Sequence, residues 1–89
     1  MKAIVSVIGL DMPGIVAAVS GVLAQHKVNI TDISQSYAQE FFTMIMVVDF
    51  ETSNSTLKEV DQDLKEAGET IGVFISIQHE DVFRAMHRI

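Results

Sequence analysis

One segment constrains the fold of this 89-residue chain more than any other: an apolar strand that enters a helix through the turn Asp11-Met12-Pro13-Gly14. Residues 2–8 alternate as strand residues do, and apolar residues recur at helical spacing from Ile15 onward. Pro13 suits the first position of a helix, because its φ is already helical and its missing N–H would have no intrahelical partner. Met12 precedes the proline and is therefore expected to be the N-cap.

The N-terminal end of that helix is a candidate site for a small anion. Its first N–H groups have no intrahelical partners and the helix dipole is positive there, so a carboxylate is favoured. Gly14 has no Cβ and lets a ligand or a backbone come close. The same features stabilise any helix start. On residue chemistry alone, a purely structural role is therefore the better explanation of the turn.

The rest of the chain continues to alternate between strand and helix patterns. Ala38-Gln39-Glu40 is short enough for a hairpin, Thr56 and Glu59 have capping-box spacing, and Gly68 is expected to end the second helix. The expected strands are residues 2–8, 28–37, 41–50 and 71–79, and the expected helices are residues 14–26, 56–68 and 80–89.

The order βαββαβ predicts an α+β fold of the ferredoxin-like sandwich class. We expect a four-stranded antiparallel sheet with both main helices on one face, in one domain over residues 1–79. Residues 80–89 are expected to form a short C-terminal helical tail, in which Val82, Phe83, Met86 and Ile89 share one side.

The third strand is apolar on both of its faces. Phe42, Met44, Met46, Val48 and Phe50 point to one side, and Phe41, Ile45 and Val47 point to the other. A sheet with one solvated face should instead alternate between apolar and polar residues. The tail helix, a partner subunit or both are expected to cover the second face. Because a domain of this size has little core to spare, we expect a homodimer.

The composition excludes several classes of partner. Twelve acidic residues against six basic ones give a net charge of −6, with no dense basic run. This balance argues against nucleic acid and against anionic membrane surfaces as partners. The chain has no cysteine and no apolar run of the roughly 18 residues that span a bilayer. No signal-peptide cleavage site is evident, and a cytoplasmic protein is expected.

Candidates for catalysis or metal binding are weak in this chain. His26, His79 and His87 lack metal-ligand spacing, and the carboxylates of Asp11, Asp32 and Asp49 fall on separate elements. Motifs for nucleophilic catalysis and phosphate loops are missing from the sequence. We therefore predict no catalytic residue, no metal site and no cofactor.

Two segments resemble a known family, the ACT domain. They are Asp11-Met12-Pro13-Gly14-Ile15-Val16 at the first turn and Val28-Asn29-Ile30 at the second strand. ACT domains are small regulatory modules that commonly bind amino acids and pair across subunits. The resemblance spans residues 1–79, and the chain looks like small stand-alone bacterial ACT proteins of uncharacterised function.

The resemblance implies a ligand pocket with two halves. Asp11, Met12, Pro13, Gly14 and Ile15 would form one half. Asn29 and Ile30 would come from the other side of a subunit interface.

Three hypotheses for function follow. The first is a non-catalytic regulatory or sensor module that binds a small amino-acid-like ligand at a homodimer interface. The alternative is a ligand-independent protein-interaction module that docks through its sheet or its tail helix. The third is a small enzyme, which is disfavoured because the sequence contains no evident activated nucleophile or acid–base pair. Saturable stabilisation by a metabolite distinguishes the first from the second.

Overall fold

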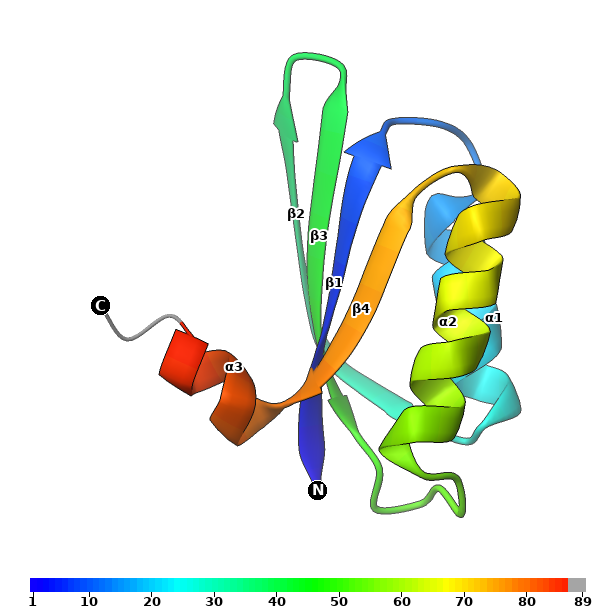
Figure 1. Cartoon of the computed structure of the whole chain (residues 1–89), viewed down its shortest axis with the longest axis vertical. Coiled ribbons are helices and arrows are strands. Elements are labelled where there is room, and N and C mark those ends of the chain that lie inside the picture. The colour runs from blue at the N-terminus through cyan, green and yellow to red at the C-terminus, as the bar shows by residue number, and fades with distance from the viewer. Residues whose placement is uncertain (87–89) are drawn as a thin grey trace.

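A central antiparallel sheet with helices on both faces organises the chain, and the computed structural model describes residues 1–86 (Figure 1). The strand order is β2-β3-β1-β4. The strands are β1 (Lys2–Leu10), β2 (Asn29–Ala38), β3 (Phe41–Asp49) and β4 (Phe74–His79). The helices are α1 (Ile15–Gln25), α2 (Leu57–Ile71) and α3 (Glu80–Met86). Helices α1 and α2 cover one face of the sheet, and α3 lies on the other (Figure 1).

The predicted fold class, a four-stranded antiparallel sheet of βαββαβ order with both main helices on one face, is confirmed. The hairpin between β2 and β3 has the expected position, with Ala38 paired to Phe41. Ile89, which was expected to share the apolar side of the tail helix, lies outside the described residues. None of the helices within residues 1–86 is long and apolar enough to cross a membrane.

The start of α1 differs from the prediction. Its N-cap is Gly14 rather than Met12, and Pro13 precedes the helix instead of occupying its first position. The reason lies in the backbone of Gly14, whose φ of 92° and ψ of −2° are left-handed. These angles match the third residue of a type II turn, for which proline is favoured at the second position. Pro13-Gly14 therefore forms a turn, and the helix begins after it.

The end of α2 also differs from the prediction. The helix continues past Gly68 to Ile71, and Gly72, with a φ of 81°, is its C-cap. Gly68 serves close packing instead: a Cβ there would lie 2.6 Å from the carbonyl oxygen of Val73. The sequence contains two glycines near the helix end. Only the second adopts the left-handed conformation that ends a helix.

The core lies between the sheet and the helix pair α1 and α2. Alternate residues of β1 and β3 point into it, and Val5, Val7, Met44 and Met46 are fully buried. Val19 and Leu23 of α1 and Val60 and Leu64 of α2 close the core from the helix side. The two ends of the sheet and the face opposite α1 and α2 are not part of this core, so they are the places where the sheet can contact other groups.

The two helical glycines provide a matched test of this packing. Gly68→Ala should destabilise the fold by about 1–3 kcal/mol, because the new Cβ overlaps the Val73 carbonyl and the Ile75 side chain. Gly21→Ala in α1 meets nothing within 4 Å. It should stabilise the fold by roughly 0.5–1 kcal/mol. Urea unfolding of both variants measures the two changes, and equal effects would contradict the packing argument.

The capping box of α2 has a pH signature. The Thr56 N–H donates to Glu59 Oε1 at 2.9 Å, and Thr56 Oγ1 accepts from the Glu59 N–H at 3.2 Å. The bond from the Thr56 backbone lowers the pKa of Glu59 below its usual range. A lowered pKa means that the ionised carboxylate stabilises the fold above the ordinary glutamate range. This stabilisation is lost as the pH falls through the folded-state pKa.

We therefore expect acid to cost the wild type more stability than Glu59→Gln, whose amide oxygen still accepts the Thr56 bond without titrating. Unfolding midpoints between neutral and strongly acidic pH measure the difference. Glu69→Gln on the exposed face of the same helix is the control. Parallel pH profiles for wild type and Glu59→Gln would refute the assignment.

Candidate functional site

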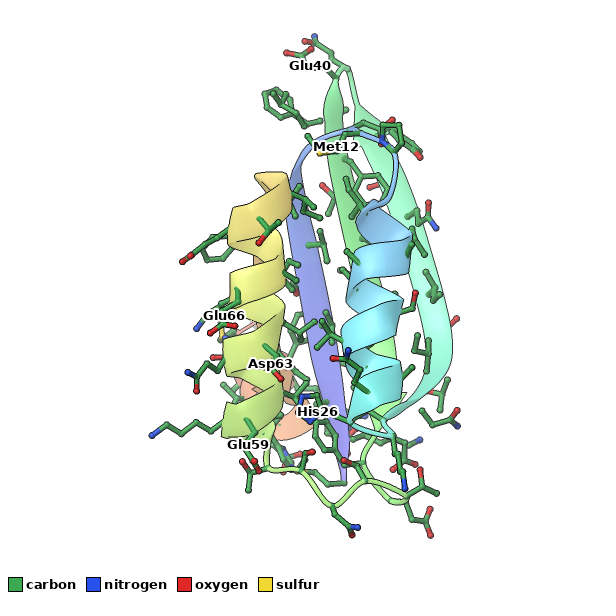
Figure 2. All side chains as sticks on the ribbon, turned by 90° about the vertical axis from the view of Figure 1, so that its right-hand side faces the viewer. Met12, His26, Glu40, Glu59, Asp63 and Glu66 are labelled. Atoms are coloured by element: carbon green, nitrogen blue, oxygen red, sulfur yellow. The ribbon has the colours of Figure 1, made fainter. Side chains whose placement is uncertain are left out.

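The turn from β1 to α1 is exposed and is hydrogen-bonded at both of its ends. Its backbone is fixed at the near end, where the Asp11 N–H donates to the carbonyl oxygen of Glu40 at 3.0 Å. This bond ties the turn to the tip of the β2–β3 hairpin. In Figure 2, Met12 lies below Glu40, which stands at that tip. At the far end, the Ala18 N–H donates to the carbonyl of Gly14 at 2.9 Å and closes the first turn of α1.

The N-terminus of α1 carries no side-chain cap and no acidic residue in its first turn. By helix geometry, the N–H groups before Ala18 have no partner within the helix. Asp11, Met12, Pro13 and Gly14 are all exposed around this end. The turn thus presents amide donors next to one exposed carboxylate. This combination suits a ligand that carries both a negatively charged and a positively charged group.

Ile15 contributes differently from its neighbours. The whole residue is only 2% exposed, and its side chain belongs to the core. Because that side chain anchors the start of α1, any contact of Ile15 with a ligand would be made by its backbone N–H. The predicted residues 11–15 are therefore together in space, and they divide into an exposed turn and a buried anchor.

Asn29 and Ile30 lie at the opposite end of the sheet. Asn29 pairs with Asp49, which pairs with Lys2 at the start of β1, whereas the turn follows Leu10 at its end. Across the nine residues of β1, a strand covers about 26 Å. Asn29 is exposed and Ile30 packs partly against the core. One chain therefore does not bring the two predicted half-sites together.

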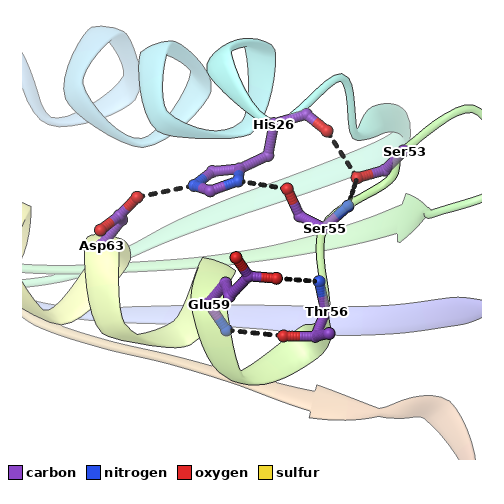
Figure 3. A network of polar contacts seen from close by, with 6 residues as sticks. All are labelled: His26, Ser53, Ser55, Thr56, Glu59 and Asp63. Carbon is purple, nitrogen blue, oxygen red and sulfur yellow. Dashed lines mark hydrogen bonds and ion pairs between the residues drawn. The ribbon is translucent and has the colours of Figure 1, made fainter.

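A polar cluster that sequence reasoning missed lies near the Asn29 end (Figure 3). His26 at the end of α1 is held on both ring nitrogens: Nδ1 lies 2.6 Å from Ser55 Oγ, and Nε2 lies 2.6 Å from Asp63 Oδ2. Ser53 Oγ donates to the His26 carbonyl at 2.5 Å and accepts from the Ser55 N–H at 3.1 Å. The cluster joins α1, α2 and the loop before α2.

Sequence patterns assign no role to His26, which lacks metal-ligand spacing, yet its side chain is only 16% exposed. No local motif could have signalled the cluster, because its members are 29 and 37 residues from His26 in the chain. An ionised carboxylate only accepts hydrogen bonds, so Nε2 is the donor to Asp63; in the neutral ring, Nδ1 then accepts from Ser55.

A serine, a histidine and an aspartate in series are also the residue types of a hydrolytic triad. Nucleophilic chemistry further requires amide donors aimed at an oxyanion beside the serine. Here the start of α2 follows Ser55 directly, and its capping-box residues Thr56 and Glu59 bond each other. The hydrogen bonds of the cluster join the end of α1 to α2, and we call the cluster the clasp.

The clasp predicts a specific loss of stability. His26→Ala leaves Asp63 and Ser55 without their shared partner and should cost about 1–3 kcal/mol. His79→Ala is the matched control, because the His79 side chain is more exposed and its Nδ1 contacts the nearby residue Asp81 instead of a distant element. Chemical denaturation at neutral pH measures both variants, and equal losses would refute the clasp.

Comparison with known proteins agrees with the fold. The sequence model described as the ACT domain matches residues 2–78. A UPF0237 protein of Methanopyrus kandleri is 49% identical over 88 residues, covering 99% of this chain and 98% of that protein. Relatives therefore include archaeal proteins, so the expected bacterial origin is not established.

Two solved structures extend the comparison. An ACT domain protein from Streptococcus pneumoniae superposes with a TM-score of 0.81 at 41% identity, covering 93% of both chains. The regulatory subunit of aspartate kinase from Thermus thermophilus superposes with a TM-score of 0.65 at 26% identity, covering 86% of this chain and 50% of that one. In related proteins, this domain is thus a regulatory module.

Proposed function

This chain belongs to the ACT domain family, and from that we propose a non-catalytic regulatory module that binds a small amino-acid-like ligand at a homodimer interface. The observation that carries the proposal is the uncapped N-terminus of α1 beside an exposed carboxylate. A helix end without a side-chain cap leaves its amide donors available to an external anion.

An amino acid matches the chemistry of the turn with both of its charges. Its carboxylate would accept from the N–H groups of Gly14 and Ile15, where the helix dipole is positive. Its ammonium group would face the carboxylate of Asp11. Met12 and Pro13 would contact the aliphatic part of the ligand. The left-handed Gly14 keeps the approach open, since no atom lies within 4 Å of where a Cβ would be.

The second half of the pocket would come from another copy. β2 is an edge strand whose residues are almost all exposed, and α1 packs beside it. If two copies pair along β2 in antiparallel fashion, the Ala38 end of one strand meets the Asn29 end of the other. The turn of one copy would then lie near the partner's Asn29 and Ile30. The Asn29 amide both donates and accepts, and therefore suits either charged group of the ligand.

Regulation follows from where the ligand would bind. A ligand held between two copies binds the dimer better than the monomer, so it shifts the population toward the dimer. A partner protein that recognises only the monomer or only the dimer would then respond to the ligand concentration.

A thermal-shift screen of free amino acids tests the proposal at fixed protein concentration. A ligand that binds only the folded state adds roughly 2.7 kcal/mol at 100 times its Kd. Each kcal/mol raises the melting temperature of a domain of this size by about 4–8 °C. Two derivatives of the best amino acid should each give a much smaller shift than the amino acid itself. The N-acetyl derivative lacks the ammonium charge, and the decarboxylated amine lacks the carboxylate. Shifts of equal size from either derivative would contradict recognition of both charges.

Two substitutions locate the site. In Asn29→Ala and in Asp11→Asn, the concentration of the best amino acid that gives half of the maximal thermal shift should rise at least tenfold. Asn54→Ala, at an exposed loop asparagine, is the matched control and should leave the titration unchanged. A shift that survives both site variants would place the ligand elsewhere on the domain.

A second candidate function, the ligand-independent interaction module, is favoured by one observation. The sheet face opposite α1 and α2 exposes several large apolar side chains. If no amino acid shifts the melting curve, this face becomes the basis of the function.

A further inference from the structure

Strand β4 forms the second edge of the sheet, and its outer side is unpaired. Within residues 1–86, β1 is the only strand that pairs with β4, and α2 lies beside it (Figure 1). Every second residue of an edge strand directs its N–H and C=O away from the sheet. β4 carries no lysine, carboxylate or proline, the residues that commonly protect an edge. This edge can therefore accept an extended segment of another chain.

A small groove lies between this edge and α2. We call it the β4 groove, and it has a volume of about 160 Å³ and is lined by Lys65, Glu69, Val73, Phe74 and Ile75. Pockets for small-molecule ligands usually measure roughly 300–1,000 Å³. The β4 groove is therefore better matched to a single side chain than to a small-molecule ligand. Its floor is apolar, because Val73 and Ile75 belong to the core.

The two charged side chains of the groove differ in their contacts. The Lys65 ammonium lies 2.8 Å from Asp61 Oδ2 and is thus paired within its own helix. The Glu69 carboxylate has no hydrogen-bond or ion-pair partner among residues 1–86. The groove thus offers one unpaired negative charge next to an apolar floor. A lysine or arginine side chain fits both features, because its stem packs on apolar surface while its charged head stays at the rim.

The charge of α2 selects among the possible occupants of this edge. The helix carries five acidic residues and two basic ones. If the β4 strands of two copies paired, two such helices would lie side by side, and their like charges would repel. The same repulsion disfavours nucleic acid and anionic membranes. A basic segment of a different protein would instead be attracted to the groove.

We propose that the β4 groove binds an extended, basic segment of a partner protein, which adds to β4 as a further strand. A lysine or arginine of this segment would lie over Val73 and Ile75 and pair with Glu69. Side chains alternate along a strand, so the next residues of the segment would point to the opposite face. There, an apolar residue would lie beside Phe74, which is 66% exposed. The preferred segment therefore alternates between basic and apolar residues.

This docking surface goes beyond the proposed ligand site, and its use requires no ligand. Fluorescence anisotropy with a labelled, end-blocked peptide of alternating lysine and valine tests it at fixed, near-physiological salt. The peptide should bind the wild type saturably, and the same peptide with glutamate in place of lysine should not bind. Binding of the lysine–valine peptide no tighter than that of its glutamate counterpart would overturn the proposal.

A pair of charge reversals locates the peptide. Glu69→Lys should raise the dissociation constant by roughly tenfold or more, because an attractive charge becomes a repulsive one. Glu51→Lys makes the same change in the loop after β3 and should leave the dissociation constant nearly unchanged. Both residues are exposed, so both variants should fold, and thermal melting verifies this. Equal weakening by the two substitutions would mean attraction by net charge alone and would refute the site.

Two N-methylated versions of the peptide test whether it adds as a strand. Methylating the backbone nitrogens of either all lysines or all valines removes the N–H donors from only one edge of the extended peptide. Only one edge of the peptide faces β4, so one version should lose binding and the other should retain it. Equal affinities of the two versions would contradict strand addition.

Amide hydrogen exchange identifies the edge that is occupied. The amides of β4 that point away from β1 should exchange more slowly only when the lysine–valine peptide is present. Protection of these amides that grows with protein concentration in the absence of peptide would identify a second copy as the occupant and overturn the proposal. Protection by the peptide on β2 instead of β4 would overturn it as well.

The docking proposal and the ligand proposal fail separately. If the peptide binds through Glu69 but no amino acid shifts the melting curve, the groove is a docking site and the ligand proposal fails. If an amino acid shifts the melting curve but the peptide does not bind, the ligand proposal stands and the docking proposal fails.

Discussion

The fold depends on the burial of one face of β1 and β3 beneath α1 and α2. These two strands occupy the centre of the sheet and pair along their whole length, from Lys2–Asp49 to Leu10–Phe41. Their inward residues, such as Val5 and Met46, are fully buried. Because side chains alternate along a strand, this burial fixes the register, and the register fixes which residues appear at each end and on the outer face. The turn, the edge strands and the β4 groove all take their positions from it.

Much of this arrangement could be predicted from the sequence, and the errors have clear physical causes. Periodicity located the strands and helices, most clearly in β3 and α2, because alternation along a strand and an apolar stripe along a helix are direct consequences of burial. Helix boundaries were less predictable where two rules competed. Pro13 fits the first position of a helix, yet Pro13-Gly14 also fits a turn, and the left-handed Gly14 decides for the turn. Gly68 resembles a helix stop but is required for close packing against Val73.

The site is less predictable than the fold, because its parts are not local. The motif in residues 11–15 marks one half, and the distance to Asn29 becomes visible only once the register is known. The same is true of the clasp, whose side chains come from the end of α1, from α2 and from the loop before α2. A pattern along the chain cannot report that His26 faces Asp63. That information exists only in the packing of α1 against α2.

The bulge in β2 has a consequence for how this protein avoids uncontrolled association. A ten-residue edge strand is a template on which strands of other chains can add. Here the ladder with β3 shifts between Ile30 and Asp32, and polar side chains take up nearby backbone groups. Thr31 Oγ1 donates to the Val47 carbonyl at 3.0 Å, and Asp32 Oδ1 accepts from the Ile33 N–H at 2.9 Å. The break confines regular strand pairing to the straight part of the edge after Asp32, so the proposed pairing of two copies would use that part, and open-ended amyloid-like ladders are disfavoured.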